Sequence, residues 1–131
     1  MKGLYLYRGN ITNNRYKGVY DGDTIYVDFD LGFDVSLKKQ KVRLYGINAP
    51  EITGQDKDKG IASRDRLRKY LPVGRPIYIK TYQDKKGSFG RWLGKVYLSE
   101  NDVELRRSIN ITMVALGLAK ANKYGMKWSI A

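Results

Sequence analysis

The feature that most constrains the fold is a series of segments in which apolar and polar residues alternate, the period of a strand with one buried face. Alternation is rough over residues 4–20 and strict over 24–30. A third alternating run follows a short turn at Gly32 and ends at Ile47. Pro50 stops this run, because proline has no amide hydrogen for a ladder. The first 50 residues therefore predict three consecutive strands.

The middle of the chain changes period and predicts a helix over Gly60–Leu71, after an exposed loop over residues 52–59. Pro72 and Gly74 end this helix. Its partial apolar stripe consists of Ile61, Ala62, Leu67, Tyr70 and Leu71. Two further strands are predicted around residues 77–80 and 92–98, separated by a charged turn over 83–88. A second helix is predicted from Val103 to Leu116, with Gly117 as its stop.

This order of elements predicts a mainly β fold with helices (α+β). It matches a five-stranded OB-fold barrel with a helix between strands 3 and 4 and a second helix after strand 5. The 131 residues fit one domain, 1–131. No run has the length of a membrane span, and the first residues alternate like a strand instead of forming a signal peptide's apolar core. We expect a cytoplasmic protein, or a secreted one if a leader has been removed.

The charge of the chain points to a polyanionic partner. Lys and Arg number 25 against 13 Asp and Glu, a formal net charge of +12, which attracts polyanions by counterion release. Nucleic acid is the first expectation, and anionic lipid or mere solubility are the alternatives. The chain contains neither cysteine nor histidine. Thiolate catalysis, cysteine-bound zinc and a histidine base are therefore excluded, and hydrolytic chemistry would need carboxylates, arginines or an oxygen-bound metal.

Two motifs place chemistry at adjacent strand ends. The first is Asp21-Gly22-Asp23-Thr24, and the second is Val-Arg-Leu-Tyr-Gly-Ile-Asn-Ala-Pro-Glu at residues 42–51. Together they bring carboxylates, an amide and an arginine to one region, a suitable combination for a hard cation and a phosphate. Taken singly, Asp-Gly is also an ordinary turn signal, and Arg43 or Glu51 is an ordinary surface charge.

Together with a turn Phe89-Gly90-Arg91 and the run Ala-Leu-Gly-Leu-Ala at 115–119, these motifs resemble the staphylococcal nuclease (thermonuclease) family. The similarity extends from about Tyr7 to about Lys120. It implies a calcium-dependent phosphodiesterase that cleaves DNA and RNA and leaves 3′-phosphate ends. Ca²⁺ is the implied cofactor, with Mg²⁺ or another divalent ion as the alternative.

The resemblance also implies residue roles. Asp23 would be a carboxylate ligand of the metal, Asn48 a second side-chain ligand, and the Ala49 carbonyl a backbone ligand. The catalytic residues would be Glu51, which activates or orients water, and two arginines that hold the phosphate, Arg43 and Arg91. An arginine suits this position because its planar fork matches two phosphate oxygens.

The chain departs from the family pattern at two of these positions. Asn48 replaces the usual aspartate, which removes one negative charge and should weaken calcium binding. Phe89 replaces the tyrosine of a Tyr-Gly-Arg turn, so an aromatic face remains but a hydroxyl is lost. Tyr124 is a near candidate for a second aromatic wall. Further substrate contacts are predicted from the loop lysines Lys57, Lys59 and Lys85.

Three functions follow from the sequence. The first is a monomeric nuclease with little sequence specificity that prefers single-stranded nucleic acid, since nothing resembles an element for reading the major groove. The second is a catalytically weak or inactive nucleic-acid-binding OB-fold domain, which the change at Asn48 favours. The third is a basic scaffold protein, whose binding to protein would be insensitive to salt.

Overall fold

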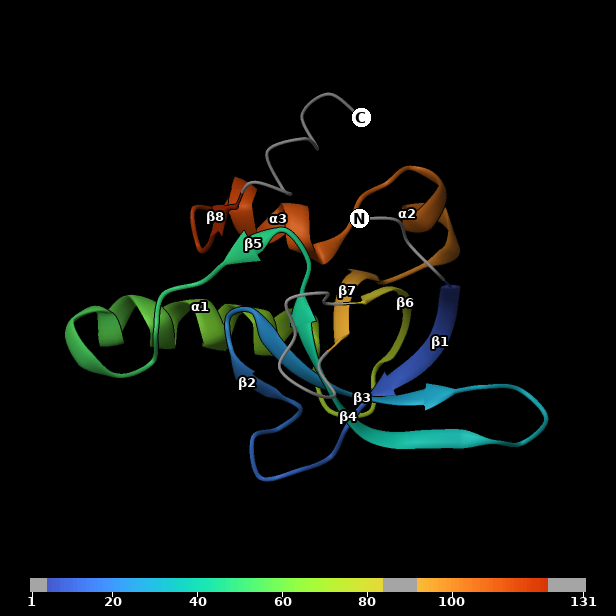
Figure 1. Ribbon diagram of the computed structural model, residues 1–131. Coiled ribbons are helices and arrows are strands. Elements are labelled where there is room, and N and C mark those ends of the chain that lie inside the picture. Colours follow the sequence, from blue (N-terminus) through green and yellow to red (C-terminus); the bar gives the residue numbers. More distant parts are fainter. Residues whose placement is uncertain (1–4, 84–91, 123–131) are drawn as a thin grey trace.

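The computed structural model describes residues 5–83 and 92–122, and its centre is a closed five-stranded mixed barrel (Figure 1). The strands lie in the spatial order β1-β6-β7-β4-β3 and back to β1. All pairings in this ring are antiparallel except that of β4 with β7. The barrel strands are β1 (Tyr5–Ile11), β3 (Thr24–Asp30), β4 (Ser36–Leu44), β6 (Pro76–Gln83) and β7 (Trp92–Tyr97). This arrangement confirms the predicted OB-fold-like α+β class.

Shorter strands and helices complete the fold. β2 (Val19–Asp21) pairs with the start of β3, and β5 (Ile47–Asn48) pairs with β8 (Lys120–Ala121) outside the barrel. A 3₁₀ turn (Gly54–Asp56) leads into α1 (Lys57–Tyr70), which lies between β4 and β6 in the chain, as predicted. After β7 come α2 (Glu100–Glu104) and α3 (Ile109–Ala115). None of the helices in the described part of the chain is long and apolar enough to cross a bilayer.

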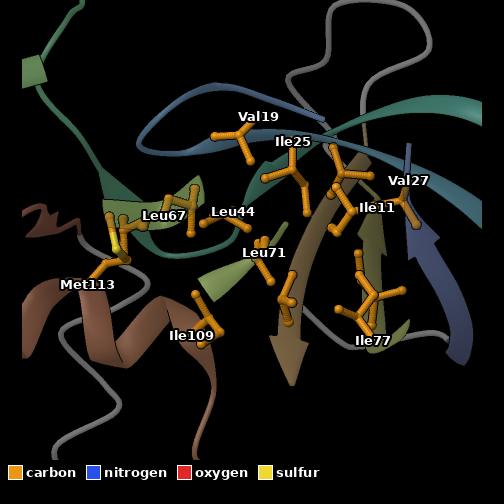
Figure 2. Close-up of a cluster of buried hydrophobic side chains, with 14 of the residues drawn as sticks. Ile11, Val19, Ile25, Val27, Leu44, Leu67, Leu71, Ile77, Ile109 and Met113 are labelled. Atoms are coloured by element: carbon orange, nitrogen blue, oxygen red, sulfur yellow. The ribbon is translucent and has the colours of Figure 1, made fainter. Parts of the chain in front are cut away.

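The core fills the barrel and the space under α1 and α3. Figure 2 shows side chains from the strands meeting Leu67 of α1, Leu71 directly after α1, and Ile109 and Met113 of α3. The strand contributions follow the alternation of the sequence, because every second residue of a strand points inward. The fully buried barrel residues are Ile11, Ile25, Val27, Val42, Leu44, Ile77, Ile79 and Val96.

The buried face of α1 differs from the predicted apolar stripe. Gly60, Ser63 and Leu67 are its buried residues, while Ile61 is only half-buried and Ala62 is exposed. The predicted stripe was wrong at its start because two small residues allow α1 to approach its neighbours more closely than large side chains would. The helix also begins at Lys57, three residues before the predicted start.

Two predicted continuous segments are interrupted. Over residues 4–20 the strand stops at Ile11, and a turn follows in which Asn14 Oδ1 accepts hydrogen bonds from two backbone amides. The predicted second helix is divided into α2 and α3 by Arg106, which has a φ of 56°, and Ser108, which caps α3 by accepting from the amide of Ile111. The prediction of one helix over 103–116 was wrong, because the capping serine starts a new helix.

Candidate functional site

The first part of the candidate site is the turn Asp21–Asp23 between β2 and β3, which we call the carboxylate turn. Asp21 and Asp23 are buried, with 9% and 5% of their surface exposed. The Asp23 amide donates to Asp21 Oδ1 at 3.1 Å, and the Thr24 hydroxyl donates to Asp23 Oδ1 at 3.2 Å. The carboxylate of Asp21 thus fixes the backbone of Asp23.

Three other predicted site residues lie around Asp23, two in direct contact with its carboxylate and the third through Arg43. The Ala49 amide donates to Asp23 Oδ2 at 2.8 Å, and a guanidinium nitrogen of Arg43 lies 3.5 Å from the same oxygen. That Arg43 nitrogen also donates to Asn48 Oδ1. Thr24 at the start of β3 is directly opposite Arg43 at the end of β4, so strand register brings the two motifs together at the rim of the barrel.

Burial dominates the electrostatics of this cluster. The pKa of Asp23 is raised from 3.8 to about 6, first by burial and then by the hydrogen bond and the charge of Asp21. The Ala49 amide and the Arg43 guanidinium act in the opposite direction without reversing the shift. Two buried carboxylates are therefore incompletely neutralised by the protein itself, because the cost of desolvation exceeds what one arginine and one amide return.

The donor atoms at this position fit a hard divalent cation. Asp23 offers carboxylate oxygens and the adjacent Asn48 an amide oxygen, and calcium binds such oxygens in a flexible geometry. The burial of two carboxylates, Asp21 and Asp23, beside one arginine favours a cation here. Within residues 5–83 and 92–122, however, no group of three or more acidic side chains surrounds one point. Asp21 was absent from the predicted ligands, although its spacing of two residues from Asp23 was a usable signal.

Glu51 lies beside this cluster in the chain but in a different environment. It follows Pro50 and is exposed. In the described part of the protein, its carboxylate forms no hydrogen bond or ion pair. Its backbone is tightly packed, since a Cβ atom on Gly60 of α1 would lie 2.0 Å from the Glu51 carbonyl oxygen. The position of the segment is therefore set by α1, while the acid itself faces water.

Helix α1 supports the carboxylate turn in the same way. A Cβ atom on Gly22 would lie 2.0 Å from Ser63 Oγ and 2.7 Å from the Cβ of Ala49. Ser63 is fully buried, and its hydroxyl has no hydrogen-bond partner among the described residues. The packing roles of Gly60 and Ser63 were not predictable from the sequence, because close approach between distant elements leaves no periodic pattern.

A cleft of about 600 Å³ adjoins the site. Asn48 and Ala49 belong both to the Asp23 cluster and to the wall of this cleft. Lys59 also lines the cleft, whereas Lys57 is exposed outside its lining. Both lysines were predicted to lie in a loop, but they belong to the first turn of α1. The remaining lining residues are Pro50, Asp56, Ala62, Gly117, Leu118, Ala119 and Lys120.

Four predicted site residues lie outside the described residues, and their positions stay predictions. They are Lys85, Phe89, Arg91 and Tyr124.

Comparison with known families gives one match. Residues 41–129, more than half of the chain, match the family described as Staphylococcal nuclease homologue. The matched segment contains Arg43, Asn48 and Glu51, and the carboxylate turn precedes it. A search of curated proteins found no match.

Proposed function

The chain belongs to the staphylococcal nuclease homologue family, whose members are in general nucleases that bind nucleic acids, and we propose that it is a metal-dependent nuclease. It hydrolyses phosphodiester bonds of DNA and RNA with little sequence specificity, uses Ca²⁺, and leaves 3′-phosphate ends. The observation that carries this proposal is the buried Asp23 carboxylate, whose pKa is raised chiefly by burial and which contacts the Arg43 guanidinium and the Ala49 amide beside Asn48.

The proposed metal ligands are Asp23, Asn48 and the carbonyl of Ala49. A bound divalent ion supplies positive charge at the phosphate and polarises an oxygen ligand. Asp23 is held for this role by the amide of Ala49 and the hydroxyl of Thr24, so little side-chain entropy remains to be lost on binding. The change from aspartate to Asn48 leaves an oxygen donor but one negative charge fewer.

Arg43 is proposed to hold the phosphate. Its guanidinium carries five N–H donors in a planar fork, so it can keep its contact with Asp23 and still present donors to two phosphate oxygens. Its side chain is 30% exposed, which gives a ligand access to it. Arg91 is proposed as the second arginine of this clamp on the strength of the family resemblance.

Glu51 is proposed to take a proton from the attacking water. Its carboxylate is exposed and not engaged with another described side chain, so it is free to accept a proton. Its segment is nevertheless positioned by the contact of its backbone with Gly60. Substrate contacts are proposed from Lys57, Lys59, Lys85, Phe89 and Tyr124.

The test is cleavage of denatured DNA and of RNA by the purified chain with calcium, magnesium or chelator. Cleavage should require the divalent ion. Glu51→Gln should lower the rate by about 10²- to 10⁴-fold, as for loss of a general base, and Arg43→Ala by about 10²- to 10³-fold, as for loss of a transition-state donor. Full activity in chelator, or in both variants, would overturn the assignment.

A second candidate, a nucleic-acid-binding OB-fold domain without catalysis, is favoured by two observations. The described residues contain no group of three acidic side chains placed to hold a metal ion, and Asn48 supplies an amide where the family has a carboxylate. This candidate predicts tight, salt-dependent binding of nucleic acid with no cleavage under any metal condition.

A further inference from the structure

Three tyrosines and two cations form a second cluster on the outside of the barrel. We call Tyr16, Tyr20, Tyr26, Arg15 and Lys41 the tyrosine shelf. The Tyr16 and Tyr26 rings are stacked, with centroids 5.7 Å apart and planes at 14°, and Tyr20 meets Tyr16 edge-on at 5.2 Å. Arg15 Cζ lies 4.8 Å from the Tyr16 centroid, and Lys41 Nζ lies 5.9 Å from that of Tyr20. All three rings are partly exposed, and both cations are exposed.

The shelf is continuous with the candidate site. Tyr26 of β3 is opposite Lys41 of β4, and the next pair on the same face is Thr24 opposite Arg43. Side chains two residues apart on a strand share a face and are separated by about 7 Å. Tyr20 is followed directly by the carboxylate turn. A strand of nucleic acid that leaves Arg43 along β4 would therefore meet the shelf next.

The loop that carries Tyr16 is fixed to the rest of the protein. Arg68 of α1 donates to the carbonyl oxygens of Tyr16 and Val19, both at 3.0 Å. Asn14 Oδ1 accepts from the amides of Tyr16 at 3.1 Å and Gly18 at 2.9 Å. An arginine of the distant helix α1 and an asparagine of the loop itself thus hold the loop in place before any ligand arrives, which reduces the entropy lost on binding.

The cations of the tyrosine shelf differ from another arginine that lies over a tyrosine ring elsewhere on the barrel. Arg8 lies over the ring of Tyr78, 5.9 Å from its centroid, but it also pairs with Glu100 at 3.9 Å. Arg15 and Lys41 have no carboxylate within ion-pair distance among the described residues. A cation held over an aromatic ring without a carboxylate keeps its full charge for an incoming anion.

We propose that the tyrosine shelf is a binding subsite for single-stranded nucleic acid next to the site of cleavage. Arg15 and Lys41 contact phosphates, and bases stack on the tyrosine rings. This combination is the one by which single strands are bound without sequence readout, because every base has a face that can stack. A duplex hides those faces and can use only the cations. The choice of nucleic acid as ligand rests on the proposed function.

The test is fluorescence anisotropy with a short labelled oligothymidylate in chelator, so that binding is measured without cleavage. Arg15→Gln should weaken binding and reduce the salt slope by about 0.7, the contribution of one phosphate contact to a single strand. Arg8→Gln also removes a positive charge over a tyrosine ring, but it should leave both the affinity and the salt slope unchanged. Tyr16→Ala should weaken binding by about tenfold, and Tyr16→Phe, which keeps the ring but loses the hydrogen bond that Arg15 donates to the Tyr16 hydroxyl, by less than Tyr16→Ala.

Several results would overturn the proposal. Equal effects of Arg15→Gln and Arg8→Gln would do so, as would equal losses for a duplex and a single strand in Tyr16→Ala. If Tyr16→Ala fails to fold by circular dichroism, Tyr16→Phe and the two arginine variants still decide. Cleavage of the same oligonucleotide with calcium is measured in parallel. If binding depends on the shelf residues but no cleavage occurs, the proposed nuclease activity is wrong and the shelf proposal stands. If cleavage depends on Glu51 but the shelf variants bind normally, the shelf proposal is wrong and the nuclease activity stands.

Discussion

The carboxylate turn and the Glu51 segment are the two acidic parts of the candidate site, and they differ in nearly every physical respect. Asp23 is buried, receives hydrogen bonds from Ala49 and Thr24, and has a pKa raised to about 6 by its burial. Glu51 is exposed, and its carboxylate forms no hydrogen bond or ion pair with another described residue. One carboxylate is prepared to hold a cation, and the other is left in contact with water.

One helix, α1, positions both acidic parts of the candidate site. Helix α1 packs Gly60 against the Glu51 backbone and Ser63 against Gly22 of the carboxylate turn, each at a distance that leaves no room for a larger residue. Rigid placement therefore comes from close backbone approach, and the difference between the two acids comes from burial. Four substitutions test this division.

The largest expected effect is that of Gly60→Ala on the exposed segment. Alanine in a helix gains up to about 1 kcal/mol over glycine, but a Cβ atom 2.0 Å from a backbone oxygen forces the helix and the Glu51 segment apart. Overpacking of this kind costs about 3 kcal/mol. We expect a net fall in the free energy of unfolding of about 2 to 3 kcal/mol, measured by urea denaturation, together with a loss of cleavage.

The control for this substitution is Arg66→Ala on the exposed face of the same helix. It should change the free energy of unfolding by no more than about 0.5 kcal/mol. Full stability of Gly60→Ala would show that the segment is free to move, and the contrast between the two acidic parts would lose its basis.

Asp23→Asn tests the cost of the buried carboxylate. Because the folded-state pKa is raised, the stability that Asp23 contributes is present below about pH 4 and is lost as the pH rises through about 6. A shift of about two units corresponds to about 3 kcal/mol, reduced by the lost attraction to Arg43. In chelator, we expect the variant to be more stable than the native chain by about 2 kcal/mol at pH 8 and equal to it near pH 4.

This pH dependence is measured as the difference between thermal unfolding curves of the two proteins, with Asp28→Asn as a control at a less buried position. A difference that is constant with pH, or that grows toward acid, would contradict the assigned cost of burial.

Gly22→Ala tests the contact of the carboxylate turn with α1. We expect a loss of about 1 to 2 kcal/mol in the free energy of unfolding, because the nearest atom is a side-chain hydroxyl that can shift. Ser63→Gly removes that hydroxyl, so the double variant should be more stable than the sum of the single changes predicts. Additive effects in this double-mutant cycle would show that the two residues do not share the contact.

The smallest expected effect is an increase of about tenfold in calcium affinity when Asn48 is changed to aspartate. Asn48→Asp restores a negative charge beside Asp23 and should tighten calcium binding, measured by isothermal titration calorimetry. Asn101→Asp adds the same charge in α2 and should leave the affinity unchanged. Equal or weaker calcium affinity in Asn48→Asp would separate this position from the proposed metal site.

Much of the fold was predictable because alternation is a local property. The strict alternation over 24–30 and the burial of Val42 and Leu44 around the outward Arg43 follow from the two-residue period of a strand. The division of the second helix was not predicted, because a left-handed conformation at Arg106 and the cap formed by Ser108 are set by local backbone geometry. The stripe on α1 failed for a different reason, since its buried face contains glycine and serine.

By itself, the sequence determined the order of strands and helices, the excess of positive charge, the absence of histidine and cysteine, and the two motifs of the site. Only the tertiary structure decided that Asp23 is buried with Asp21 while Glu51 is exposed, that α1 touches both segments through Gly60 and Ser63, and that three tyrosines extend the face of Arg43. The physical reason is that periodicity specifies which way a residue points along its own element. Burial, pKa and close approach depend on distances between elements that are far apart in the chain.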